Sequence, residues 1–141
     1  MRNGKRRKIV VDTNLWISFL MSVSIRRRLN RLLVSDDIDL LFSQELFDEL
    51  ETMAKRRKFH KYFDVSHVDD LIEMLVEVAE VVPVRSMVEI CRDPKDNFLL
   101  ALAQDGFANY LITGDNDLLS MEKLGKTKIV SLSNFEKMLR E

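Results

Sequence analysis

Acidic side chains occupy positions in this chain where folding alone does not require them. Asp12 directly follows the apolar run 9–11, and Asp115 follows the largely apolar run 110–114. Two further acids border apolar helical stripes, and these are Glu49 and Asp96. Strand ends and helix edges can bring distant residues together, and carboxylates that meet repel one another unless a cation lies between them. The pattern predicts a divalent-metal site on an α/β scaffold.

Asp12 and Asp115 each also fit a purely structural role. Asp12 is a suitable N-cap for a helix that begins at Thr13, and Asp115 is suited to shaping the turn 114–117. The sequence leaves both alternatives open. In an open α/β sheet, however, ligands bind beyond the carboxyl ends of the strands, which is where both residues fall.

Glu49 lies beside the apolar stripe of the clearest predicted helix, residues 43–57. Leu46, Leu50 and Met53 form this stripe at helical spacing, and Glu49 projects next to it. Burying an unpaired carboxylate is costly, so Glu49 requires a partner. The partner is either a metal ion or a nearby Arg or Lys, and the sequence does not decide between them.

Asp96 heads the apolar stripe of another predicted helix. The run 93–96 is a strong helix start, because it places Asp at the cap and Pro at the first helical position. Leu99 and Leu100 then follow Asp96 on the buried face. One aspartate suffices for the cap and Asp93 is better placed for it, so we expect Asp96 to point into the site.

The candidate metal ligands are all carboxylate oxygens, which suit the hard cations Mg²⁺ and Mn²⁺. A zinc site is not expected, because His60 and His67 form no ligand-spaced pair and Cys91 is alone. A carboxylate-bound Mg²⁺ lowers the pKa of a water, polarises a phosphate and stabilises a leaving oxygen in phosphodiester cleavage. It also lets an acidic pocket accept a polyanion.

The composition predicts one soluble, cytoplasmic domain. A chain of 141 residues with 46% hydrophobic residues suits a single core. A lone cysteine fits a reducing compartment, and no signal peptide opens the sequence. The longest apolar stretch, residues 98–103, is far too short to cross a membrane.

Basic residues are clustered, although the net charge is only −1. The clusters lie at residues 2–8, 26–28 and 55–58, and they suit either a polyanion such as nucleic acid or a solvated face. Residues 1–7 are interpreted as a loose basic tail, and residues 8–141 as the folded domain.

Apolar strands alternate with helices along the chain. Strands are expected at residues 8–11, 40–42, 81–82, 109–113 and 128–130. Helices are expected at residues 13–21, 24–34, 43–57, 94–105 and 118–123, from Ser66 onward, and from a capping box of Ser133 and Glu136. This alternation predicts an α/β fold with a parallel sheet covered by helices.

Four motifs resemble those of the PIN domain in their order and spacing. They are residues 10–14 (VVDTN), 43–50 (SQELFDEL), 93–97 (DPKDN, followed by LALA at 100–103) and 111–119 (LITGDNDLL). The resemblance covers the chain from Lys8, and it is to the small prokaryotic VapC-like ribonucleases of toxin–antitoxin systems. It implies a PIN-like three-layer fold with a five-stranded parallel sheet flanked by helices.

The resemblance also implies a Mg²⁺- or Mn²⁺-dependent endoribonuclease that leaves 5′-phosphate and 3′-hydroxyl ends. The implied partners are the RNA substrate, an antitoxin protein and a second copy of the chain. The residues that match the family's acids are Asp12, Glu49, Asp96 and Asp115, with Asp117 as an additional acid. Thr113 matches a hydroxyl residue that supports the first aspartate, and Asn14 matches a polar residue next to the site. The candidates for holding the RNA backbone are Arg26, Arg27, Arg28, Arg56 and Arg57.

Two other classes of protein share features with the chain. A phosphoacceptor receiver domain has a similar size and a Mg²⁺-binding acid cluster, but it requires an acidic pair after the first strand, where this chain has Asp12-Thr13-Asn14. A PIN domain that binds nucleic acid or a protein without cleaving it is the second alternative. Lost acids would mark such a module, and none of the family's acids is lost here.

Overall fold

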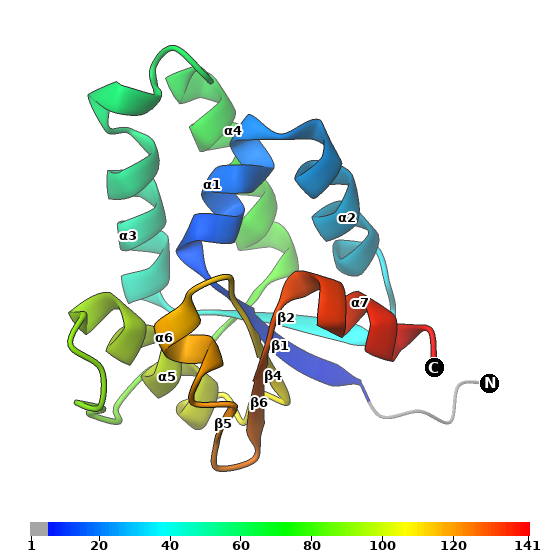
Figure 1. The fold of residues 1–141 in the computed structure, drawn as a ribbon. Helices are drawn as coiled ribbons and strands as arrows, with labels where there is room; N and C mark the ends of the chain where they lie inside the picture. Colours follow the sequence, from blue (N-terminus) through cyan, green and yellow to red (C-terminus); the bar gives the residue numbers. More distant parts are fainter. Residues whose placement is uncertain (1–5) are drawn as a thin grey trace.

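The computed structural model describes residues 6–141, which form one six-stranded sheet with helices on both faces (Figure 1). The strand order is β3-β2-β1-β4-β6-β5. All neighbouring strands pair in parallel except β5 and β6, which are antiparallel. The strands are β1 (Arg7–Val11), β2 (Ile38–Phe42), β3 (Glu80–Val81), β4 (Tyr110–Ile112), β5 (Lys123–Leu124) and β6 (Thr127–Val130).

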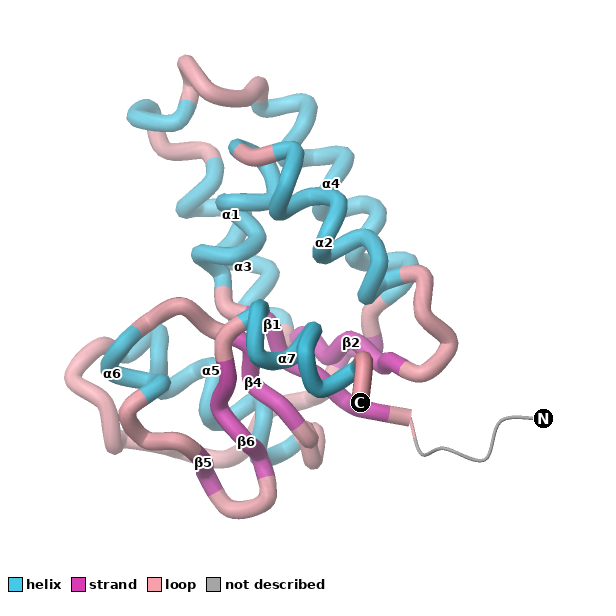
Figure 2. The backbone as a smooth tube through the Cα atoms, turned by 45° about the vertical axis from the view of Figure 1, so that its right-hand side comes forward, coloured by secondary structure: helices cyan, strands magenta, loops and turns pink. Residues whose placement is uncertain are grey.

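Helices α1 to α4 gather on one side of the sheet, and α5 packs on the other against β1, β2 and β4 (Figure 1). The helices are α1 (Thr13–Met21), α2 (Val23–Leu33), α3 (Gln44–Ala54), α4 (Val65–Val78), α5 (Pro94–Asp105), α6 (Asn116–Leu119) and α7 (Leu132–Leu139). A 3-10 turn, η1 (Arg57–Phe59), lies between α3 and α4. In both views this connection is at the end of the helical layer away from the sheet (Figures 1 and 2).

The central strands are buried on both faces, which explains their unbroken apolar sequences. Val10, Val11, Leu111 and Ile112 have no measurable exposure.

Helix α5 ends at Gly106, where a Cβ would lie 2.7 Å from the Leu41 side chain and 3.1 Å from a carbonyl of the preceding turn. A side chain at this position would therefore push α5 away from the sheet.

The fold class and most elements agree with the sequence-based prediction, and the helix at residues 13–21 has the expected bounds. The sheet contains a sixth strand that the sequence analysis missed. Residues 123–124 form β5, whereas a helix was expected over 118–123. The backbone of Glu122 has a φ of 65° and that of Gly125 a φ of 58°, and these left-handed residues reverse the chain into β6.

Two predicted helix ends were wrong. The C-terminal helix begins at Leu132 and is capped by Ser131, whose hydroxyl accepts from the backbone N–H of Asn134 at 3.1 Å, so Ser133 is not its cap. The helix predicted over 43–57 ends at Ala54. Its expected basic end lies instead in the connection to α4, where the chain turns tightly through η1.

Other expectations concern the surface and the termini. Trp16 and Phe19 of α1 belong to the core, whereas Met21 at the end of this helix is half-exposed. The predicted basic tail lies largely outside the described residues, although Arg6 pairs with Asp39 on β2. Within residues 6–141, no helix is both long and apolar enough to cross a membrane.

Candidate active site

The adjacent strands β1 and β4 end side by side, with Val11 paired in register with Ile112. Asp12 therefore follows β1 directly next to Thr113 and the start of the turn that carries Asp115. Helix α5 supplies Asp96 in its first turn, and α3 supplies Glu49. Elements from both faces of the sheet thus deliver acids to the carboxyl ends of the two strands.

Asp12 is 5% exposed and uses each carboxylate oxygen differently. Its Oδ1 accepts from the backbone N–H of Asn14 at 3.3 Å and caps α1, so the structural role considered from the sequence is real. Its Oδ2 accepts the hydroxyl hydrogen of Thr113 at 2.7 Å. Burial raises the pKa of Asp12, whereas these two hydrogen bonds lower it by stabilising the carboxylate.

Thr113 connects the acids that follow the two strands. It is fully buried and donates to Asp12, while its Oγ1 accepts from the backbone N–H of Asp115 at 3.0 Å. Asp115 in turn caps α6 by accepting from the backbone N–H of Asp117 at 2.9 Å. The positions of Asp12 and Asp115 are therefore set by one hydroxyl group in the floor of the site.

Asp96 and Asp115 interact directly across the gap between α5 and the end of β4. Burial raises the pKa of Asp96 to about 7, with the negative charge of Asp115 and a hydrogen bond to its side chain acting in the same direction. The carboxylate of Asp12 contributes a smaller repulsion. Asp96 therefore keeps its proton to a higher pH than an ordinary aspartate does.

Glu49 lies at the edge of this group and is half-buried. Burial raises its pKa, as does the charge of Asp12, while the charge of Lys95 and a hydrogen bond from Thr13 lower it. Lys95 provides part of the basic partner considered as the alternative to a metal ion. Among residues 6–141, however, no Lys or Arg lies within 4.0 Å of the Glu49 carboxylate.

The remaining predicted site residues are more peripheral. Asp117 and Asn14 are exposed, and the hydrogen bonds described for them use backbone groups rather than their side chains. Cys91, which the sequence analysis did not place in the site, lies within electrostatic reach of Asp96, Asp115 and Asp117. Burial and these charges raise the pKa of its thiol, so it is an unreactive neighbour.

The arginines predicted to bind RNA differ in whether their side chains already make contacts within the protein. Arg26 donates to the carbonyls of Phe19 and Leu20, and Arg28 forms a bidentate ion pair with Glu136 on α7. Both side chains stabilise helix packing. The exposed members of the set are Arg27, Arg56 and Arg57.

The donor set fits a hard divalent cation in its chemistry, because it consists of carboxylates that repel one another and form no ion pair with a Lys or Arg of residues 6–141, with Lys95 only partly offsetting the charge of Glu49. In the arrangement described, no group of three or more His, Cys, Asp or Glu side chains of residues 6–141 is close enough to hold a metal ion.

The fold and these grouped acids define an α/β domain with a carboxylate site at the end of its central strands. The profile of the PIN domain matches residues 8–117, and the chain belongs to this family. That membership sets aside the receiver-domain alternative. No curated protein matches the chain.

Solved structures that share the fold include two toxin–antitoxin complexes. One is VapBC2 from Rickettsia felis bound to a DNA fragment from the promoter, with a TM-score of 0.58, 12% identity, and coverage of 86% of this chain and 96% of that chain. The other is VapBC-1 from nontypeable Haemophilus influenzae, with a TM-score of 0.59, 17% identity, and coverage of 89% and 98%. At these identities the likeness establishes the shared fold.

Proposed function

We propose that this PIN domain is a metal-dependent endoribonuclease. The observation that carries the proposal is the burial of Asp12 and Asp96, at 5% and 8% exposure, without an ion pair to a Lys or Arg of residues 6–141. Two buried carboxylates that face a third acid are costly to maintain for structure alone. A site that binds a cation compensates for that cost.

Asp12, Asp96 and Asp115 would hold Mg²⁺ or Mn²⁺, with Glu49 and Asp117 completing the ligand set or binding a second ion. When bound, the metal supplies Lewis-acid activation of water and phosphate. The chain's own contribution is to orient the ligands. Thr113 fixes Asp12 through a 2.7 Å hydrogen bond, and the α1 N-terminus fixes its other oxygen.

RNA is the proposed substrate, and exposed cations are available to hold its backbone. Arg56 and Arg57 begin the connection between α3 and α4, and Arg27 is exposed on α2. None of these three guanidinium groups forms an ion pair with another residue of the described chain. They can therefore bind phosphates without first breaking an internal contact.

The biological setting is proposed by analogy with the VapBC structures. We infer that the chain is the toxin component of a toxin–antitoxin pair, that it acts in the cytoplasm and that an antitoxin protein is its partner. A homodimer is a further possibility that the family resemblance raises. Growth arrest on expression, relieved by Asp12→Asn, is the expected phenotype, and unimpeded growth would favour an RNA-processing role.

The enzymatic proposal is tested by digesting RNA with Mg²⁺ or Mn²⁺ and again with EDTA, and by mapping the ends. We expect cleavage that leaves 5′-phosphates, is abolished by EDTA and falls at least 100-fold in Asp12→Asn and Asp96→Asn. Asp48→Asn is the matched control, because Asp48 is an exposed acid of the same helix as Glu49. RNA binding without cleavage by the wild type would instead support the non-cleaving PIN alternative.

A further inference from the structure

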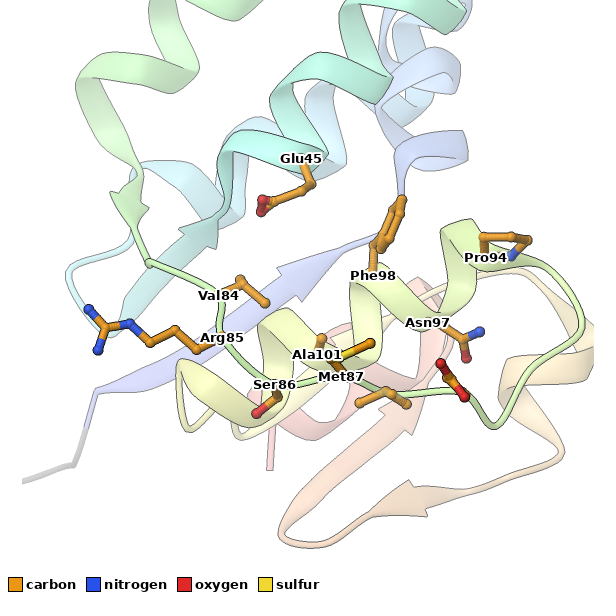
Figure 3. A pocket seen from close by; sticks show the side chains of 11 residues that line it. Glu45, Val84, Arg85, Ser86, Met87, Pro94, Asn97, Phe98 and Ala101 are labelled. Carbon is orange, nitrogen blue, oxygen red and sulfur yellow. The ribbon is translucent and has the colours of Figure 1, made fainter.

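A cavity of about 500 Å³ opens next to the acids, between the start of α3, helix α5 and the segment that leads into α5 (Figure 3). Its walls combine apolar side chains with two carboxylates and with Arg85, whose guanidinium extends away from Phe98 in Figure 3. The residues that matter for its chemistry are Glu45, Val84, Met87, Glu89, Phe98 and Ala101. In Figure 3, Glu45 extends from α3 above the cavity, and Phe98 rises from α5 beside it.

The cavity and the acids share the same two helices. Glu45 lines the cavity one helical turn before Glu49, so the two side chains are about 6 Å apart along one face of α3. Pro94 and Asn97 line the cavity on either side of Asp96 in the first turn of α5, and Phe98 follows on the exposed side of that helix. A ligand in the cavity therefore lies beside the helix turn that carries Asp96.

The wall formed by residues 82–92 has no regular secondary structure but is held at two points by side chains of α5. Asp105 accepts from the backbone N–H groups of Arg85 and Ser86 at 2.6 and 2.8 Å. Asn97 exchanges two hydrogen bonds with the backbone of Cys91, at 2.8 and 3.0 Å. The cavity is thus shaped before any ligand enters, which reduces the entropic cost of binding.

These contacts also show which polar groups remain for a ligand. Ser86 and Asn97 are already hydrogen-bonded within the wall. Glu45 and Glu89 are exposed and form no ion pair with a residue of the described chain. Phe98 is 48% exposed, and its ring stacks on no other described aromatic ring. The cavity therefore offers an aromatic face and hydrogen-bond acceptors.

We propose that this cavity binds an unpaired guanine base of the RNA substrate next to the cleaved bond, an inference that rests on the proposed ribonuclease function. Single-stranded bases are recognised by stacking on aromatic rings and by hydrogen bonds to their Watson–Crick edges. Guanine presents two adjacent N–H donors on that edge, which fit one carboxylate. Uracil presents carbonyl oxygens on either side of its single donor, and Glu45 and Glu89 would repel them.

The test uses short single-stranded RNAs that carry one guanine in a uracil background. The guanine is replaced in turn by inosine, which lacks the 2-amino group, and by adenine, cytosine or uracil. Cleavage positions are mapped with Mn²⁺, and binding is measured by fluorescence anisotropy with Asp12→Asn protein, which does not consume the RNA. We expect cleavage beside the guanine, and weaker binding with inosine and still weaker binding with uracil.

Variants of the cavity separate stacking from hydrogen bonding. Phe98→Ala is expected to weaken binding of the guanine-containing RNA about tenfold and to remove the positional preference. Phe98→Leu keeps apolar bulk without the ring and should behave like Phe98→Ala if stacking is the cause. Glu45→Gln and Glu89→Gln show which carboxylate accepts from the 2-amino group. In the variant that lacks this acceptor, the affinities for the guanine- and inosine-containing RNAs should become more similar. Phe107→Ala is the control, because Phe107 is 81% exposed outside the cavity.

The outcomes distinguish the two proposals. The base site would be overturned if RNA is cleaved but neither the cleavage positions nor the RNA affinities change in Phe98→Ala, Glu45→Gln and Glu89→Gln. The ribonuclease proposal would remain intact in that case. The base site would also be overturned if Asp12→Asn protein with an otherwise unchanged cavity binds the guanine-containing RNA and the RNA with uracil in its place equally well. If no RNA is cleaved but binding still depends on the guanine and on Phe98, the base site stands and the enzymatic proposal fails.

Discussion

Replacing Asp96 with asparagine should stabilise the metal-free protein at pH 8 while abolishing activity. Burial and the neighbouring Asp115 raise the pKa of Asp96 from an ordinary value of 3.8 to about 7. An acid with a raised pKa favours folding in its protonated form, so its ionisation costs stability as the pH rises through about 7. Three pKa units correspond to about 4 kcal/mol, which is the upper limit of the effect at pH 8.

Asp96→Asn removes this cost because the amide is neutral, has nearly the same size and can donate to Asp115. In EDTA at pH 8, its free energy of unfolding is expected to exceed that of the wild type by up to about 4 kcal/mol. The difference should fall to about 1.6 kcal/mol at pH 5, where Asp96 is protonated in the folded protein but largely ionised in the unfolded chain, and it should vanish only below the ordinary pKa of 3.8. Added Mn²⁺ should stabilise the wild type more than the variant, because the variant lacks one proposed ligand.

The assay is urea denaturation followed by the fluorescence of Trp16, the single tryptophan, which is fully buried in the native state. Wild type, Asp96→Asn and the exposed-acid control Asp48→Asn are compared at pH 5, 6.5 and 8 in EDTA. A variant no more stable than the wild type at pH 8 would refute the reasoning. A stability gain of equal size at pH 5 would also refute it, because the gain would then not depend on ionisation.

Three further outcomes follow from individual contacts. Thr113→Val should destabilise the protein by about 2 kcal/mol in urea denaturation and reduce cleavage, because the buried Asp12 loses a charge-assisted hydrogen bond, whereas Thr113→Ser should retain both properties. Arg28→Ala should cost about 1–2 kcal/mol through loss of the bidentate pair with Glu136, without changing RNA affinity. Asp105→Asn should speed proteolysis within residues 82–92, and the wild type should show the same sensitivity at acidic pH. Hydrogen bonds lower the pKa of Asp105 below its ordinary value of 3.8. Its carboxylate therefore holds this segment above pH 3.8 and releases it as the pH falls through the lowered pKa.

The sequence predicted the acids at the strand ends because that part of the fold is governed by local rules. The run 9–11 is apolar enough to identify a buried strand, and Asp12 then falls at its carboxyl end. The unbroken burial of β1 and β4 also implied parallel pairing. The structure adds that these two strands are neighbours in the sheet, which brings Asp12 and Asp115 together.

Features that depend on contacts between distant elements were not predictable in this way. Arg26 and Arg28 belong to a basic triplet that is expected to be exposed from the sequence. In the structure, Arg26 donates to carbonyls at the end of α1, and Arg28 pairs with α7. Ser131 and Ser133 are both suitable caps in sequence, and the position of β6 decides in favour of Ser131. Lys95 lies on α5, two residues after the cap Asp93, and its charge lowers the pKa of Glu49 on α3, a contact that the sequence analysis did not predict.

The pairing of β4 with β6 has a consequence for where the domain can be cut. The family match ends at Asp117, and every proposed ligand lies within it, but the backbone N–H of Thr113 donates to the carbonyl of Val130 at 3.0 Å. A chain ended at Asp117 would leave one side of β4 as an open strand edge, which is prone to pair with another copy. Residues 118–141 carry none of the proposed chemistry, yet the part that carries the proposed ligands cannot be expected to fold as a monomer without them.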